Sequence, residues 1–156
     1  MADRMTPAGR RAHMGRIRAE DTQPEMTVRR MLHALGYRYV LHDARLPGKP
    51  DLVFPIMRKV LFVHGCFWHG HDCGRGFRPK TNAEFWKAKI DGNKARDRRN
   101  LRLIRASGWS VFTVWECRTQ PAKIDALRRR LLAFLGPRLS GARPVRQADQ
   151  TQAAPG

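Results

Sequence analysis

The chain has 156 residues, of which 42% are hydrophobic, and this suits one globular domain with a sizeable core. The charge is unusual, because 31 Lys and Arg against 13 Asp and Glu give a net charge of +18. Solubility requires only a small net charge, so this excess predicts a polyanionic partner, a nucleic acid before a membrane surface. No apolar run approaches the roughly 18 residues of a membrane-spanning helix, and no secretory or lipidation signal is visible. We therefore expect a cytoplasmic protein without a membrane partner, and a monomer by default.

Residues 1–20 are rich in Arg, Ala and Gly. We interpret them as a flexible basic segment that orders on DNA, and the alternative is a frayed terminus. Thr22–Glu25 then has the pattern of a capping box, which predicts a helix that Gly36 ends. Its apolar positions recur at helical spacing at Val28, Met31, Leu32 and Leu35. Capping alone already explains the presence of Glu25.

Short β-rich runs follow at residues 37–41, 51–54 and 59–64, and the last two are expected to form a hairpin through residues 55–58. A second capping pattern, Thr81–Glu84, predicts another helix, which Gly92 interrupts or ends before a very basic helix over 93–107. A strand over 109–115 and a helix over 121–135 complete the pattern. The fold class is α/β, a small mixed sheet flanked by helices within a domain over 21–136. Residues 137–156 are expected to be disordered.

Metal-binding residue types concentrate directly after the strand over 59–64. Cys66, His71 and Cys73 offer two thiolates and an imidazole within eight residues, and zinc prefers such ligands. The fourth ligand is either His69 or the distant Cys117. Four protein ligands would close the coordination shell and make the site structural. The alternative is three unrelated buried thiols.

A hydrolytic centre is predicted beside this loop. Asp51 opens one strand and faces a second strand that ends at His64. One carboxylate with a main-chain carbonyl is a sufficient protein contribution to a Mg²⁺ site, because this ion keeps several waters. His64 and His69 are spare if zinc takes His71, and a histidine can activate water for attack on phosphorus. The alternatives are a turn residue for Asp51 and surface positions for the histidines.

Two aromatic residues, Phe67 and Trp68, interrupt the polar metal loop, and exposed aromatics there predict stacking or wedging against bases. Trp86 either joins them or belongs to the core. The helical segment that follows is basic, and its charged side chains form either a face that contacts DNA phosphates or a merely solvated face. These residues are Lys87, Lys89, Lys94, Arg96, Arg98, Arg99, Arg102 and Arg105.

These residues resemble the very short patch repair endonuclease family. The likeness runs from about Arg11 to Leu135 and includes Pro50-Asp51, then FVHGCFWH over 62–69, then His71 and Cys73. It also takes in Glu25, Glu84-Phe85-Trp86, Asn93, Asp97-Arg98-Arg99, and GW at 108–109 with VWEC over 114–117. Members of this family nick DNA 5′ of the thymine in T:G mismatches that arise when 5-methylcytosine deaminates.

The resemblance implies a restriction-endonuclease-like core in which Asp51 and the main-chain carbonyl of Val63 bind catalytic Mg²⁺. It implies that His69 activates water, that Asp97 orients His69, and that His64 and Glu25 support them. It assigns structural Zn²⁺ to Cys66, His71, Cys73 and Cys117. It further implies that DNA is contacted by Met14, Arg16, Phe67, Trp68, Trp86, Lys89 and Arg96. Recruitment of MutL and a bacterial, nucleoid-associated location follow from the same likeness.

Two features depart from the family pattern. Position 63, often Thr in the family, is Val here, and the Arg-rich segment 74–80 has no clear counterpart. Two other functions stay open, a zinc-containing DNA-binding protein without cleavage and a restriction enzyme that cuts both strands. Dependence on Mg²⁺ separates the first from a nuclease, and the number of strands cut separates the second.

Overall fold

The computed structural model describes residues 20–138. The predicted DNA contacts Met14 and Arg16, the rest of the segment before Glu20 and almost all of the predicted tail lie outside this range. The helices and strands are α2 (Gln23–Ala34), β1 (Val40–Leu41), β2 (Leu52–Phe54), β3 (Lys59–His64), α3 (Ala83–Ala106), β4 (Ser110–Trp115) and α4 (Ile124–Leu135). The predicted α/β class with a small mixed sheet is confirmed. None of the described helices is both long and apolar enough to cross a bilayer.

The sheet has the strand order β1-β2-β3-β4. β1 pairs with β2 and β2 with β3 in antiparallel fashion, which confirms the predicted hairpin through residues 55–58. β4 pairs with β3 in parallel, with His64 opposite Trp115 at the end of the register. A parallel pair requires a crossover connection, and α3 provides it. The residues that follow β3 and those that follow β4 therefore emerge at the same edge of the sheet.

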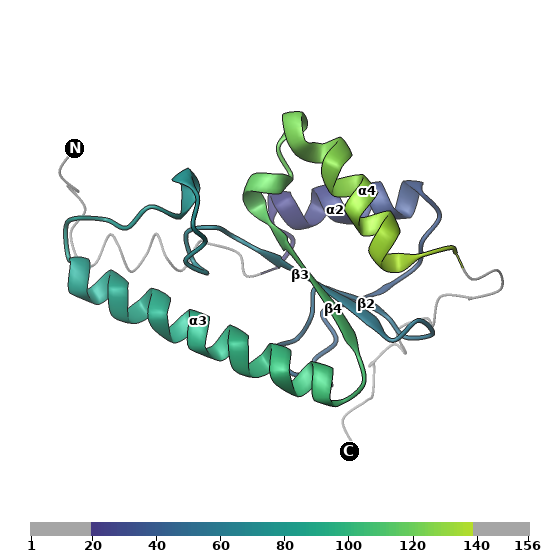
Figure 1. Cartoon of the computed structure of the whole chain (residues 1–156), viewed down its shortest axis with the longest axis horizontal. Helices are drawn as coiled ribbons and strands as arrows, with labels where there is room; N and C mark the ends of the chain where they lie inside the picture. Colours follow the sequence, from purple (N-terminus) through teal and green to yellow (C-terminus); the bar gives the residue numbers. More distant parts are fainter. Residues whose placement is uncertain (1–19, 139–156) are drawn as a thin grey trace, which may run out of the picture.

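Helices cover both faces of the sheet, with α2 and α4 on one side and α3 on the other (Figure 1). Alternation of side chains along the strands supplies the two layers of core. Leu52, Phe54 and Leu61 pack with Leu32 of α2 and Leu131 of α4. On the opposite face, Val53, Val60 and Phe62 pack against Ile104 of α3.

The first helix begins as its sequence predicts. The side chain of Thr22 accepts a hydrogen bond from the N–H of Glu25. The carboxylate of Glu25 reaches one residue further back than a capping box requires and accepts from the N–H of Asp21 at 3.0 Å. Glu25 therefore ties the chain before α2 to its first turn.

Two predictions for the middle of the chain are wrong. The Thr81–Glu84 pattern does not form a capping box, because the N-cap of α3 is Asn82 and not Thr81. Asn82 has a left-handed backbone, and its side chain makes no capping hydrogen bond. Gly92 neither interrupts nor ends the helix, which continues to Ala106. A glycine inside a helix costs only about 1 kcal/mol. Burial of Trp86 and Ile90 before it and of Ile104 after it outweighs that cost.

Two other elements are shorter than predicted. Only Val40–Leu41 pairs as a strand, while Tyr37 and Tyr39 direct their rings edge-on against Phe54. Their hydroxyls donate to the carbonyls of Gly136 and Arg29, which holds this segment against α4 and α2 without strand pairing. The last helix starts at Ile124, because residues Pro121–Lys123 form a separate 3-10 turn.

Candidate active site and metal centre

The parallel pairing of β3 and β4 brings together the predicted zinc ligands. Cys66 lies two residues after His64, and Cys117 lies two residues after its partner Trp115. The N–H of Cys117 points to the Cys66 sulfur at 3.4 Å. The ligand atoms of Cys66, His71, Cys73 and Cys117 all lie within 4.8 Å of one another. The fourth member of the cluster is therefore Cys117, and the alternative choice, His69, lies elsewhere.

A compact loop builds the other half of this cluster. The N–H of His71 donates to the carbonyl of Cys66 at 2.9 Å, which closes a turn between them. A side chain at Gly76 would meet the carbonyl oxygen of His71 at 1.8 Å, so only glycine allows the loop to return onto itself. The ring of His71 stacks on Trp115 with centroids 4.2 Å apart.

The donor set and its spacing fit a tetrahedral zinc ion. Metal–ligand distances of 2.0–2.3 Å in a tetrahedron place ligand atoms roughly 3.3–3.8 Å apart. The Cys117 sulfur lies 3.7 Å from Nδ1 of His71. Burial raises the pKa of the Cys66 thiol to about 12. Burial opposes ionisation of Cys73 too, but hydrogen bonds from His71 and from the N–H groups of Arg75 and Gly76 lower its pKa to about 6.

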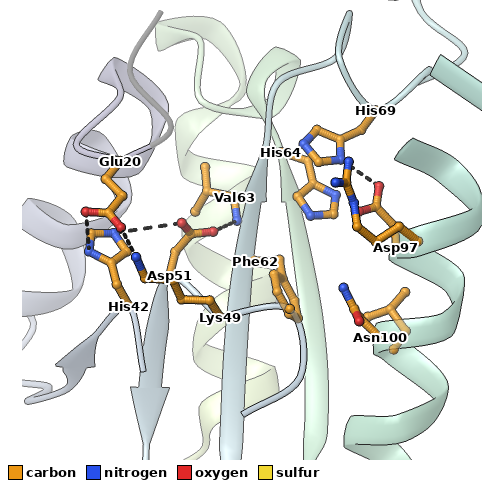
Figure 2. Close-up of a pocket in the computed structure, with 13 residues that line it drawn as sticks. Glu20, His42, Lys49, Asp51, Phe62, Val63, His64, His69, Asp97 and Asn100 are labelled. Atoms are coloured by element: carbon orange, nitrogen blue, oxygen red, sulfur yellow. Dashed lines mark hydrogen bonds and ion pairs between the residues drawn. The ribbon is translucent and has the colours of Figure 1, made fainter. Parts of the chain in front are cut away.

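A separate pocket lies between the strand ends and α3 (Figure 2). Asp51 stands in this pocket just before β2, and its Oδ2 accepts the N–H of Val63 at 2.7 Å. Burial, with the nearby charge of Glu25 as a smaller cause, raises the pKa of Asp51 to about 6, although the Val63 hydrogen bond opposes this. A neighbouring cation stabilises the ionised form of such a buried carboxylate.

The opposite wall of the pocket carries a histidine–carboxylate pair. Nδ1 of His69 lies 2.6 Å from the carboxylate of Asp97 on α3, which leaves Nε2 with the lone pair when the ring is neutral. Hydrogen bonding to His69 lowers the pKa of Asp97 despite partial burial. The ring of His64 stacks on His69 with centroids 3.8 Å apart. Burial lowers the pKa of His64 to about 4, so this ring is neutral near pH 7.

Glu25, in contrast, does not line the pocket. It is 1% exposed, and its Oε1 lies 2.6 Å from Nε2 of His42, a residue that the sequence analysis did not identify. His42 does line the pocket, together with Glu20 and Lys49. The sequence offered one signal for His42, because a histidine in the polar turn after a predicted strand lacks a core role.

The predicted aromatic residues form one cluster. The ring of Phe67 lies 5.1 Å from that of Trp68 and 5.3 Å from that of Trp86, centroid to centroid. Trp86 is 9% exposed, so the described conformation keeps it largely in the core. Phe77 and Phe85 border this cluster and are 63% and 50% exposed, yet the sequence analysis gave neither a DNA contact. Phe77 stands in the Arg-rich segment 74–80, where an apolar ring is out of place.

The basic residues of α3 do not share one face. Arg96 lines the pocket with Asn100, and Lys89 lies two helical turns before Arg96 on the same flank. Helical spacing puts most of the others on the opposite flank, namely Lys87, Lys94, Arg98, Arg102 and Arg105. The side chain of Lys87 pairs with Asp91 there, at 2.8 Å.

An acidic residue and a histidine–carboxylate pair face one another across an open pocket, beside a basic helix and a cluster of four soft ligands. This α/β architecture with such a pocket defines the class, a nuclease with a separate cluster of possible metal ligands. Comparison with known proteins specifies it further. The family model described as DNA mismatch endonuclease Vsr matches residues 2–75.

Three relatives match most of the chain. Type II nicking enzyme V.XorIIP of Xanthomonas oryzae pv. oryzae is 48% identical over 137 residues, 88% of this chain and 99% of that protein. Type II nicking enzyme V.NmeAIP of Neisseria meningitidis is 43% identical over 117 residues, 75% of this chain and 84% of that protein. DNA mismatch endonuclease Vsr of Escherichia coli is 43% identical over 117 residues, 75% of each chain.

The chain belongs to the Vsr family of DNA mismatch endonucleases. It is a nuclease that acts on DNA, and its activity belongs to DNA repair. The resemblance found in the sequence is thereby confirmed, as is the expectation of a nucleic-acid partner. The alternative of a DNA-binding protein without cleavage does not fit this family.

Proposed function

We propose that this endonuclease nicks one strand of a duplex 5′ of the thymine in a T:G mismatch, that it requires Mg²⁺, and that it thereby initiates very short patch repair. One observation carries the proposal, which is that Asp51 and the His69–Asp97 pair line the same pocket. A phosphodiester in that pocket has a carboxylate on one side and an imidazole on the other. The relatives named as nicking enzymes support cleavage of a single strand.

Asp51 and the main-chain carbonyl of Val63 would hold the magnesium ion. Hard oxygen ligands and a largely hydrated ion suit this small contribution from the protein. The ion, when bound, polarises the scissile phosphate and stabilises the leaving oxygen. Valine in place of threonine at position 63 leaves the main-chain carbonyl in place, and the N–H of Val63 orients Asp51. We infer a restriction-endonuclease-like core from this acidic residue at the start of a buried hairpin.

His69 is the residue that takes a proton from the attacking water. Asp97 fixes its tautomer and stabilises the imidazolium that forms. His64 stays neutral because of its burial, and its stacked ring keeps the plane of His69 fixed. A phosphate in the pocket would also lie near Arg96.

The aromatic cluster and the basic residues supply the contacts to DNA. Phe67, Trp68 and Trp86 are proposed to enter the duplex beside the mismatch, and this requires Trp86 to leave its buried position. Lys89 and Arg96 contact phosphates, and Met14 and Arg16 hold the neighbouring groove. Structural zinc at the four-ligand cluster fixes the loop that carries Phe67 and Trp68. We propose a monomer at the bacterial nucleoid that recruits MutL, on the family resemblance.

A nicking assay tests the proposal. Each strand of a duplex with one T:G mismatch in a CT(A/T)GG-type context is labelled, beside a T:A control, with Mg²⁺ or EDTA. Wild type is expected to nick only the thymine strand of the mismatched duplex, and EDTA or Asp51→Ala to abolish the nick. Asp125→Ala, which removes an exposed carboxylate of α4, is the matched control and should keep full activity.

Other outcomes would point elsewhere. Cleavage of both strands of the T:A duplex would indicate a restriction enzyme. Nicking that survives EDTA would refute the requirement for Mg²⁺, while nicking of a different mismatch would refute the proposed substrate and leave the nuclease chemistry intact.

A further inference from the structure

We propose that His42 is a positioning residue, which joins the buried Glu25 to Asp51 and fixes the orientation of the Asp51 carboxylate in the pocket. The inference rests on the proposed function, because it assigns Asp51 to the magnesium ion. It starts from the position of Glu25, which was expected to support catalysis. Glu25 is 1% exposed and has no place in the pocket lining, so its contact with the pocket runs through another side chain, that of His42.

The backbone around His42 is arranged to make that connection. His42 follows β1 directly, and its N–H donates to the carbonyl of Asp51 at 3.1 Å. Its φ of +47° lies in the left-handed region, which costs a non-glycine residue on the order of 1 kcal/mol or more. Such a conformation persists where neighbouring contacts hold it. Here it turns the imidazole towards the carboxylates instead of continuing the alternation of the strand.

The imidazole of His42 is held from both edges. Its Nε2 lies 2.6 Å from Oε1 of Glu25 and 3.9 Å from Oδ1 of Asp51. Its Nδ1 lies 3.7 Å from a carboxylate oxygen of Glu20, which is itself paired with Lys49. Figure 2 shows His42 beside Asp51 on one side of the pocket and the His69–Asp97 pair on the other.

Both carboxylate oxygens of Asp51 therefore have a neighbour in the protein, a hydrogen bond at Oδ2 and a 3.9 Å electrostatic contact at Oδ1. Oδ2 accepts the N–H of Val63 at 2.7 Å, and Oδ1 faces the ring of His42. Removal of the imidazole would leave Oε1 of Glu25 without its 2.6 Å contact and allow the carboxylate of Asp51 to rotate. Residues that orient a metal ligand in this way commonly change metal affinity or activity by about 10- to 100-fold when they are replaced.

The test compares variants of the full chain at position 42. His42→Gln keeps an N–H donor at similar reach, whereas His42→Ala removes it. His33→Ala is the matched control, because His33 is an exposed histidine in the last turn of α2. Mn²⁺ binding to each protein without DNA is measured by electron paramagnetic resonance. Nicking of the T:G duplex under single-turnover conditions is measured as a function of Mg²⁺ concentration.

We expect His42→Ala to weaken Mn²⁺ binding and to raise the Mg²⁺ concentration for half-maximal nicking by about tenfold or more, as for other residues that orient metal ligands. His42→Gln should recover most of the loss, and His33→Ala should match wild type. Glu25→Gln should have little further effect when combined with His42→Ala, because both act through one contact. Thermal melts identify any variant that is unfolded. If His42→Ala is unfolded, His42→Gln alone is compared with wild type.

The inference would be overturned if wild type and His42→Ala bound Mn²⁺ equally and depended equally on Mg²⁺. The proposed function would still stand in that case, provided that wild type nicks the T:G duplex. Failure of His42→Gln to recover metal binding, when it is folded, would overturn the role of the N–H donor. If wild type itself does not nick the T:G duplex, the proposed function fails, and Mn²⁺ binding still decides the role of His42.

Discussion

Asp51 shows at the scale of one residue how a buried carboxylate lowers the stability of the fold. Its pKa rises from an ordinary value of 3.8 to about 6, mainly through burial. The folded state therefore binds a proton more tightly than the unfolded chain, and stability falls as the pH rises from about 4 to about 6. Above that window the ionised carboxylate destabilises the fold by up to about 3 kcal/mol.

We predict that Asp51→Asn is more stable than wild type at pH 7.5 in EDTA by up to about 3 kcal/mol. The amide still accepts the N–H of Val63 and carries no charge. The advantage should disappear below pH 4, where wild type is protonated as well. Urea denaturation at a series of pH values measures both quantities, and a difference that does not change with pH would contradict the explanation.

The same residues show what sequence could and could not predict. Asp51 and His69 were identified because they flank strands with clear apolar patterns. Asp97 is 28 residues from His69 and was named only through the family resemblance, since nothing in a basic helix marks one acidic residue. His42 was missed because its role depends on one left-handed backbone angle and on a partner 17 residues away.

At the scale of elements, the parallel pairing of β3 and β4 brings together the candidate metal ligands. A sequence shows two strands that each end two residues before a cysteine, and only the parallel register puts those cysteines side by side. Local signals were less reliable. The Thr81–Glu84 pattern and Gly92 both failed to predict how α3 begins and continues, because burial along the helix outweighs local preferences worth about 1 kcal/mol.

We predict that the purified protein contains one zinc ion per chain and that Cys117→Ser loses most of it. Cys117 is the only ligand of the cluster outside the loop that follows β3. Loss of this ligand detaches residues 65–80 from the end of β4, while the two hydrophobic layers remain. Amide hydrogen exchange should therefore rise throughout residues 65–80 and stay slow in β2 and β3.

Plasma emission spectroscopy gives the zinc content, and Ser110→Ala, at the other end of β4, is a control that should keep the metal. Binding to mismatched DNA should weaken in Cys117→Ser, because Phe67 and Trp68 belong to the detached loop. A zinc-free wild-type protein with a protected loop would refute the assignment of this cluster to zinc.

At the scale of the whole molecule, a net charge of +18 makes phosphate contacts the main source of affinity for DNA. Charge alone does not say which surface binds, because basic residues lie on α3 and on α4, which cover opposite faces of the sheet (Figure 1). The pocket distinguishes the two helices, since Arg96 of α3 lines it and no residue of α4 does within residues 20–138. We therefore expect the DNA to follow the flank of α3 that carries Lys89 and Arg96.

The dependence of binding on salt tests this expectation. Each phosphate neutralised contributes about −0.9 to the slope of log K against log salt concentration. Arg96→Gln and Lys89→Gln should each reduce the slope by about one contact and weaken matched and mismatched duplexes alike, because phosphates carry no sequence information. Arg129→Gln, an equal loss of charge on the solvent side of α4, should leave the slope unchanged. Equal effects of all three substitutions would mean that net charge, and not the flank of α3 beside the pocket, determines the affinity.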